Sequence, residues 1–113
     1  MENRVRLCSP LKGGNADHVQ VIDEKLTIVA LIIDVKRRQL MMQSFLNMSE
    51  YLATKNNLLT ITVGDKSRLF HLAQDGKPYK IQRDEKIYTV SVESIGMTTE
   101  AQSRPYCDLV ISW

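Results

Sequence analysis

The fold is decided by the stretch Asp75–Ile95, DGKPYKIQRDEKIYTVSVESI, together with Tyr106–Trp113, YCDLVISW. Asp75–Pro78 is predicted to be a turn, because glycine adopts a positive φ at low cost and proline interrupts regular structure. Tyr79–Gln82 and Ile87–Ile95 alternate between apolar and polar residues, which is typical of half-buried strands. The last stretch alternates in the same way. The C-terminal half therefore predicts an antiparallel meander.

The alternation also predicts which residues enter the core. Between the first two strands, Arg83–Lys86 reads as a charged loop of four residues. Gly96–Pro105 is a polar loop, long for a hairpin connection, and is either mobile or used for contact. The predicted inward residues are Tyr88, Val90 and Val92 in one strand and Cys107, Leu109, Ile111 and Trp113 in the last.

Composition describes an ordinary globular domain. The chain has 113 residues, which suits a single domain over residues 1–113 with a usable core. Hydrophobic residues make up 43% and charged residues 25%, so neither disorder nor a membrane protein is indicated. The net charge of +2 is too small to predict nucleic-acid binding by itself. The longest apolar run, Leu26–Ile33, is too short to span a bilayer.

The two cysteines, Cys8 and Cys107, lie near opposite ends of the sequence. Neither belongs to a Cys-x-x-Cys or Cys/His spacing, so no zinc site is predicted. A disulfide between them is possible if the first and last strands are neighbours. Two reduced thiols are favoured, because the N-terminus lacks the apolar segment of a secretory signal.

The N-terminal half begins with two short strand candidates and continues into a stronger one. Arg4–Leu7 is predicted to be an edge strand, Ser9–Asp17 a loop and His18–Ile22 a second strand. Leu26–Val35, LTIVALIIDV, is apolar on both faces and rich in β-branched residues. That pattern favours a central strand buried on both sides.

The next segment, Gln39–Asn57, is predicted to be an amphipathic helix. Met41, Phe45, Met48 and Leu52 recur at helical spacing, and glycine and proline are absent. Asp34 would cap such a helix. The alternative is a strand over Gln39–Leu46, paired with the apolar strand before it and followed by a shorter helix capped by Ser49. The remaining predictions are a strand over Leu58–Val63, a turn over Gly64–Ser67 and a strand over Arg68–Leu72.

No catalytic or cofactor motif emerges from the sequence. His18 and His71 have no metal-ligand or acid partner nearby in the sequence, and no serine lies in a nucleophile-elbow context. Neither Gly13-Gly14 nor Gly64–Ser67 has the spacing of a phosphate-binding loop. The sequence therefore predicts a protein that is not an enzyme, with no catalytic residue, metal or cofactor and no small-molecule substrate.

Basic residues are the best candidates for an interaction site. Lys36-Arg37-Arg38 is the one basic cluster, and at a helix start it would oppose the macrodipole. That conflict indicates either a contact function or a later helix start. The candidate interaction residues are Lys36, Arg37, Arg38, Lys66, Arg68 and Lys77.

The order of predicted elements resembles the bacteriophage head–tail joining proteins, also called head-closure or connector proteins. The matching features are RVRL at Arg4–Leu7, the apolar strand LTIVALIIDV leading into a helix, TITV, a D-G-K turn, the YKI and IYTVSVESI hairpin and a closing apolar strand. The resemblance spans Arg4–Trp113. The chain departs from the family at Lys36–Arg38, where many members carry a Ser/Thr-x-x-Glu capping signal.

The resemblance implies an α+β fold. It would be a mostly antiparallel sheet, as a small β-barrel or sandwich, with one main helix packed against it. It also implies a ring of copies below the portal, contacts with portal, adaptor and tail proteins, and location in the bacterial cytoplasm and then in the neck of the virion. Loops at 64–76 and 96–105 would then form contacts, and Lys66, Arg68 and Lys77 would face packaged DNA.

A second class of function remains open. The chain can also be read as a small binding module, either an immunity-type inhibitor or a nucleic-acid-binding barrel. The near-neutral charge lowers the first option. Few aromatic residues are interleaved with basic ones, which lowers the second.

Overall fold

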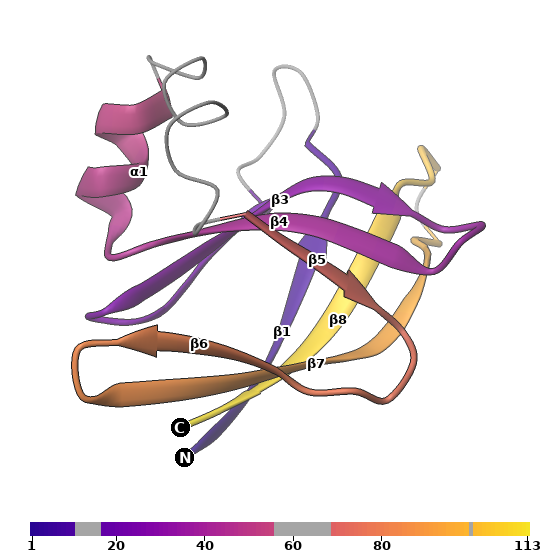
Figure 1. The fold of residues 1–113 in the computed structure, drawn as a ribbon. Coiled ribbons are helices and arrows are strands. Elements are labelled where there is room, and N and C mark those ends of the chain that lie inside the picture. Colours follow the sequence, from indigo (N-terminus) through magenta and orange to yellow (C-terminus); the bar gives the residue numbers. More distant parts are fainter. Residues whose placement is uncertain (11–16, 56–68, 100) are drawn as a thin grey trace.

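The protein is a sandwich of two four-stranded antiparallel sheets with one short helix (Figure 1). The structure is a computed structural model that describes residues 1–10, 17–55, 69–99 and 101–113. The predicted α+β class is confirmed, and of the two predicted architectures it is the sandwich. Sheet A has the order β1 (Glu2–Cys8), β8 (Pro105–Ser112), β7 (Lys86–Met97), β6 (Tyr79–Arg83), and sheet B the order β2 (Val19–Asp23), β3 (Leu26–Asp34), β4 (Gln39–Phe45), β5 (Leu69–Ala73).

The predicted C-terminal meander is confirmed as β6, β7 and β8 of sheet A. The turn between β6 and β7 is tighter than predicted. Arg83 pairs with Lys86, so only Asp84 and Glu85 lie outside the ladder. Asp84 has a φ of 54°, a left-handed conformation that aspartate tolerates better than most residues. In β7, a register shift between Val92 and Ser94 returns Ile95 to the core.

The first and last strands are neighbours, but the two cysteines do not pair. In the β1–β8 ladder Leu7 lies opposite Cys107, and Cys8 lies opposite Tyr106. Successive residues of a strand point to opposite faces of the sheet. Cys8 and Cys107 therefore lie on different faces of sheet A, and both are buried and not linked to each other by a disulfide. Burial raises the pKa of the Cys107 thiol to about 12, which keeps it protonated and unreactive.

The core fills the space between the two sheets. Sheet A contributes the residues predicted from its alternation, including Tyr88, Leu109 and Ile111, each completely buried. Sheet B contributes Leu26 and Ile28 from β3, whose burial on both faces confirms the predicted central strand. The same cluster includes Leu7, Ala30, Leu40, Met42, Leu72, Ile81, Val90 and Cys107.

The predicted long helix over Gln39–Asn57 is wrong, because its first half is strand β4. β4 pairs with β3, with Ile33 opposite Leu40 and Ala30 opposite Met42. The competing strand alternative is the one the structure adopts. Its inward residues Leu40, Met42 and Ser44 follow the period of two that a strand requires. Helical propensity is a weak preference, and pairing with the apolar β3 overrides it.

The helix, α1 (Met48–Lys55), begins later and is capped by neither predicted residue. The backbone N–H of Glu50 donates to the Asn47 side-chain oxygen at 2.9 Å, which makes Asn47 the N-cap. The backbone N–H of Leu46 donates to the Glu50 carboxylate at 3.4 Å. The helix packs on the outer face of sheet B, where the Tyr51 and Phe45 rings lie 5.4 Å apart at their centroids.

The remaining strand predictions agree with the structure where it describes the residues. The predicted strands Arg4–Leu7 and His18–Ile22 match β1 and β2 closely, and the described part of the predicted strand Arg68–Leu72, from Leu69 on, matches β5. The predicted strand Leu58–Val63 and turn Gly64–Ser67 lie outside the described residues. The predicted loop at 96–105 is shorter, since β7 extends to Met97 and β8 begins at Pro105.

The side chain of Arg104 ties this shortened loop to the body of the protein. Arg104 forms a two-pronged ion pair with the Asp17 carboxylate, both N···O distances being 2.8 Å. It also donates to the backbone oxygen of Ser9. The hydrogen bonds from Arg104 hold the pKa of Asp17 below its ordinary value, against the opposing effect of burial. The contacts of Arg104 with Asp17 and Ser9 therefore hold the C-terminal end of the β7–β8 loop against the rest of the protein.

The strand assignment of β4 predicts which of two adjacent methionines carries stability. Met42 is completely buried in the core, whereas Met41 points to the other face and is partly exposed. We expect Met42→Ala to lower the free energy of unfolding by about 2–5 kcal/mol and Met41→Ala by less than about 1 kcal/mol. Urea denaturation measures both. The opposite ranking would contradict the strand, because the helical pattern places Met41 inward and Met42 off the apolar stripe.

Candidate functional site

Cations from two separate loops meet at one end of the sandwich, which we call the basic end (residues 34–38 and 74–78). Lys36, Arg37 and Arg38 are exposed in the β3–β4 turn and not, as predicted, at the start of a helix. The expected conflict with the helix macrodipole is therefore absent. Lys77 is exposed in the connection between β5 and β6.

Specific hydrogen bonds shape the two loops of the basic end. In the β3–β4 turn, the Asp34 carboxylate accepts the backbone N–H of Arg37 at 3.1 Å. Arg38 has a φ of 53°, so the chain re-enters β4 through a left-handed residue. In the β5–β6 connection, the Asp75 carboxylate accepts the backbone N–H of Lys77 at 3.0 Å, and Gly76 has a φ of 78°.

The two loops are joined to each other through Arg38 and Gln74. The backbone N–H of Gln74 donates to the Arg38 carbonyl at 3.0 Å. The Arg38 guanidinium donates back to the Gln74 side-chain oxygen at 3.4 Å. These two hydrogen bonds extend the β4–β5 ladder. They fix the position of the β3–β4 turn relative to the β5–β6 connection, although the two loops are distant in sequence. Lys36 and Lys77 therefore belong to one surface.

The charge of the basic end is positive, with four cations against two carboxylates. Asp34 partly neutralises Arg37, at an N···O distance of 3.9 Å. In the part of the chain that the structure describes, Lys36, Arg38 and Lys77 have no carboxylate partner. Lys66 and Arg68, the other two predicted interaction residues, lie outside the described residues. The structure thus brings four of the six predicted residues together.

A concavity of about 450 Å³ lies beside the basic end. Residues of β3, β4 and β5 line most of it, and Ile32, which is 56% exposed, is the large apolar side chain of the lining that is exposed. Its polar groups are Asp34, Gln39 and the exposed His71. No residue of β6 other than Tyr79 borders it. This is a mixed surface suited to an apolar side chain with polar neighbours.

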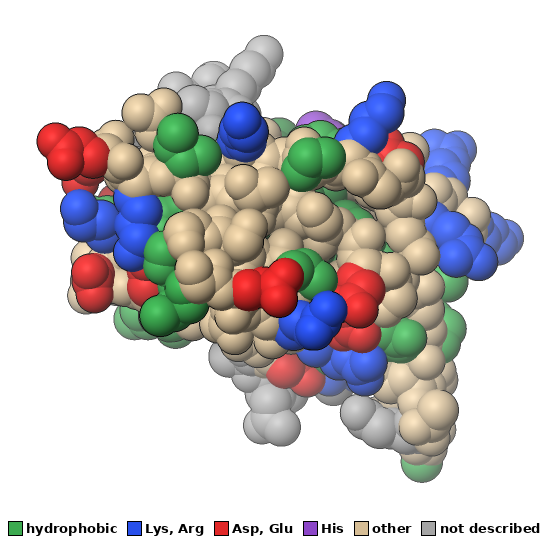
Figure 2. Space-filling view, turned by 90° about the horizontal axis from the view of Figure 1, so that it is seen from below, with side chains coloured by type: hydrophobic (Ala, Val, Ile, Leu, Met, Phe, Trp, Pro, Cys, Tyr) green, Lys and Arg blue, Asp and Glu red, His purple; other side chains and the backbone are tan. Residues whose placement is uncertain are grey.

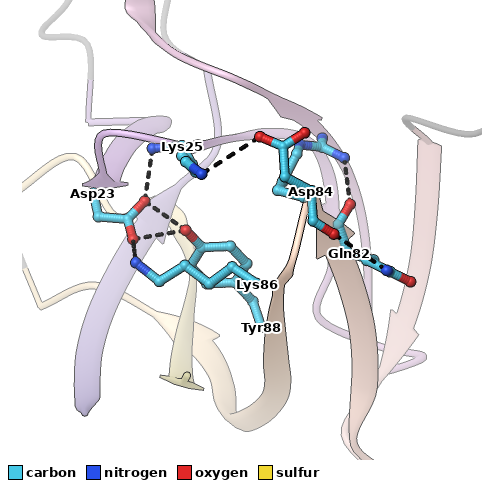
Figure 3. Close-up of polar contacts among 7 residues, drawn as sticks. Asp23, Lys25, Gln82, Asp84, Lys86 and Tyr88 are labelled. Carbon is cyan, nitrogen blue, oxygen red and sulfur yellow. Dashed lines mark hydrogen bonds and ion pairs between the residues drawn. The ribbon is translucent and has the colours of Figure 1, made fainter.

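The opposite end of the sandwich is closed by a network around Asp23 (Figure 3). The Asp23 carboxylate accepts hydrogen bonds from Lys86 Nζ at 2.6 Å and from the Tyr88 hydroxyl at 2.6 and 2.7 Å. It also accepts the backbone N–H of Lys25 at 2.8 Å. Because Asp23 belongs to sheet B while Lys86 and Tyr88 belong to sheet A, the network clamps the two sheets together.

The electrostatics of this network are those of a satisfied ion pair. Burial alone would raise the pKa of Asp23, but the hydrogen bonds from Lys86 and Tyr88 outweigh burial, so the pKa lies below its ordinary value. Burial and the bond to Asp23 raise the pKa of Tyr88. Tyr88 is completely buried, so its hydroxyl cannot reach a substrate. We assign the network a structural role.

Two outer contacts extend the clamp. Lys25 pairs with Asp84 at 3.4 Å, which links the β2–β3 turn to the β6–β7 turn (Figure 3). Arg83 donates to the Ser44 hydroxyl on β4. The Lys86 ammonium lies 5.5 Å from the ring centroids of both Tyr88 and Trp113, a cation–π geometry that also confirms the predicted packing of Trp113.

His18 and Ser94, for which the sequence offers no catalytic motif, make contacts within the fold. His18 lies 3.4 Å from the Tyr51 hydroxyl. Ser94 donates to Asp108, which also holds Arg6 through bonds of 2.7 and 3.0 Å. Within residues 1–10, 17–55, 69–99 and 101–113, no three His, Cys, Asp or Glu side chains are grouped closely enough to hold a metal.

Sequence reasoning missed the Asp23 clamp and the Asp17–Arg104 pair. Both join residues more than sixty positions apart, and no local spacing indicates such pairs. One signal existed for the first. Tyr88 occupies an inward position in an otherwise apolar face, and a buried tyrosine hydroxyl usually has a hydrogen-bond partner.

Comparisons with known proteins give no relative for this chain. No protein family, no curated protein and no solved structure shows significant similarity to it. In the described part of the chain, no helix is both long enough and apolar enough to cross a membrane.

The lowered pKa of Asp23 makes the stability of the clamp dependent on pH. A carboxyl group whose pKa is depressed by folding stabilises the protein above its unfolded pKa, and loses that contribution as pH falls through the folded value. We expect Asp23→Asn to cost roughly 1–3 kcal/mol of unfolding free energy at pH 7, because buried partners lose a charged acceptor.

The difference between the two proteins should begin to shrink as pH falls below about 4, where Asp23 of the unfolded chain becomes protonated, and should shrink further as pH falls through the lowered pKa of the folded state. Denaturant unfolding at pH 7 and at pH 3 measures it. Asp84→Asn is the matched control, because Asp84 has an exposed side chain (74%) and only one ion pair. A penalty for Asp23→Asn that is the same at both pH values would contradict the ionised clamp.

Proposed function

We propose that this chain is a non-enzymatic structural protein of a bacteriophage or prophage particle, acting at the junction of head and tail as part of a ring. The observation that carries the proposal is the basic end, an exposed charged surface built from two loops and locked by the Arg38–Gln74 bonds. A joining protein needs such preformed contact surfaces. The proposed setting is the bacterial cytoplasm during assembly and then the neck of the virion.

The fold supports this proposal in general terms and alters the resemblance in one respect. The described strands follow one another along the sequence in the order on which the resemblance rests, and TITV lies outside the described residues. The helix expected directly after the apolar strand is replaced by β4, and the short α1 follows it. The resemblance therefore depends on the strands, and the helix no longer contributes to it.

The polar chemistry of the described residues also favours a binding role. Each buried ionic group that we describe is engaged by a partner within the fold, as in the Asp23 and Asp17 contacts. The concavity beside the basic end carries one histidine and one carboxylate, and that carboxylate already accepts the backbone N–H of Arg37. Its surface suits recognition of a side chain.

Contact with packaged DNA is a second use of the same cations. Lys36, Arg38 and Lys77 are exposed and lack a carboxylate partner among the described residues, as phosphate-binding side chains do. Each phosphate neutralised on duplex DNA would add about −0.9 to the slope of log affinity against log salt. A measurable duplex affinity with that salt dependence is the signature of this second use.

A cross-linked pull-down tests the proposal directly. The tagged chain is captured from its native cells after induction of any prophage, and the captured proteins are identified by mass spectrometry. We expect portal, adaptor and tail proteins to be recovered, and their yield to fall for the Lys36→Glu/Lys77→Glu variant, because the basic end is the proposed contact.

The matched control is Arg4→Glu, which reverses a charge at an exposed position of β1, away from both ends. Recovery of a single toxin-like enzyme would overturn the proposal and favour an immunity-type binding module. Recovery of RNA or DNA without phage proteins would also overturn it and favour a nucleic-acid-binding module.

A further inference from the structure

We propose that copies of this chain associate head to tail, with the basic end of one copy against the acidic end of the next. This inference rests on the proposed function, because a ring needs a repeated contact between copies. We define the acidic end as the β2–β3 turn (residues 23–25) with the β6–β7 turn (residues 83–86). The partner at each end is a second copy of the chain.

The acidic end exposes carboxylates while its cations are engaged within the fold. It has four carboxylates against three cations. Lys86 is bonded to Asp23, and Arg83 contacts Ser44. The third cation of this end is paired with Asp84, as described above. Glu24 and Glu85 are exposed and form no ion pair with any described residue. The outward charge of this end is therefore negative.

The two ends lie at opposite ends of the same strands. The acidic end contains the turn that enters β3, and the basic end contains the turn that leaves it. Figure 1 shows these turns on opposite sides of the molecule. In Figure 2, Lys and Arg side chains gather at the right-hand end, whereas Asp and Glu side chains are interleaved with Lys and Arg side chains at the left-hand end. The side chains without a described ion pair differ in sign, being cations at the basic end and Glu24 and Glu85 at the acidic end. The molecule is therefore electrostatically polar along its strands.

Apolar groups accompany the charges at both ends. Ile87, the residue directly after the acidic end, is 50% exposed. The concavity beside the basic end presents Ile32 and Met41. Exposed ion pairs contribute little stability each, so charge alone would orient the copies without holding them. Burial of the exposed half of the Ile87 side chain in that concavity would add hydrophobic stabilisation to the contact.

The arrangement has a consequence for symmetry. Because the two contact surfaces differ and lie at opposite ends, the contact is heterologous. Heterologous contacts produce a closed ring when the rotation between copies divides a full turn, and a filament otherwise. An isologous dimer formed through either end alone would instead place like charges against each other. The polarity of the sandwich therefore favours the type of contact that a ring requires.

Charge exchange between the ends tests the inference in purified protein. One variant, Lys36→Glu/Lys77→Glu, reverses one charge in each loop of the basic end. The second, Glu24→Lys/Glu85→Lys, reverses one charge in each turn of the acidic end. None of these four side chains makes a described hydrogen bond or ion pair, so both variants should fold, which thermal unfolding followed by circular dichroism verifies.

Sedimentation velocity at low and high salt gives the association state. We expect concentration-dependent association of the wild type that weakens with salt, and association at least about tenfold weaker for either variant alone. An equimolar mixture of the two variants should associate again, because each variant then offers the charge that the other has gained. Arg4→Glu, on the outer face of sheet A, is the control for charge reversal elsewhere and should associate like the wild type.

Several results would overturn the head-to-tail contact. They are a wild type that stays monomeric at every concentration and salt, a single variant that associates as well as the wild type, and a mixture that stays monomeric. A monomer that binds a DNA duplex through Lys36 and Lys77 would assign the basic end to DNA instead. The pull-down result is independent of these outcomes, because particle proteins would be recovered whether or not the pure chain associates with itself.

Discussion

The hydrogen bonds between the buried Tyr88 hydroxyl and the Asp23 carboxylate are the contact on which the acidic end of the sandwich and the joining of its two sheets there depend. Tyr88 is the largest completely buried side chain, and an unpaired hydroxyl in that position would be costly. Asp23 satisfies it at 2.6 and 2.7 Å and draws Lys86 into the same cluster. Tyr88 thereby joins sheet A to sheet B. Because the same carboxylate binds the Lys86 ammonium, Lys86 adds little positive charge to the exposed surface of the acidic end.

The pairing of cations within the fold explains how a chain with a net charge of only +2 has one end with exposed positive charge and another with exposed negative charge. The acidic end contains nearly as many cations as carboxylates in sequence. Folding turns Lys86 and Arg83 toward partners within the sandwich and leaves Glu24 and Glu85 outside. At the basic end the reverse holds, since the bonds from Asp34 and Asp75 shape the turns while the lysines stay exposed. Net charge alone therefore says little about the surface.

Most of the fold was predictable because alternation is a local signal. Leu109 and Ile111 enter the core as their spacing predicts, and β3 is the central strand that its apolar run indicates. The helix failed because Gln39–Phe45 satisfies both periods, with Met41 and Phe45 at helical spacing and Leu40 and Met42 at strand spacing. Hydrogen bonding to the neighbouring strand β3 decides between helix and strand for this segment. The sequence of residues 39–45 alone does not reveal that neighbour.

The candidate site was predictable in its residues but not in its geometry. The basic cluster Lys36–Arg38, predicted at a helix start, and the loop position of Lys77 suggested these residues. Their common surface depends on the Arg38–Gln74 bonds between distant segments. Had Gln39–Phe45 formed a helix, residues 36–38 would have lain at its start, without the β4–β5 ladder that aligns them with residue 77. The hairpin that corrects the fold is thus the same feature that creates the basic end, and any contact made there depends on β4 remaining a strand.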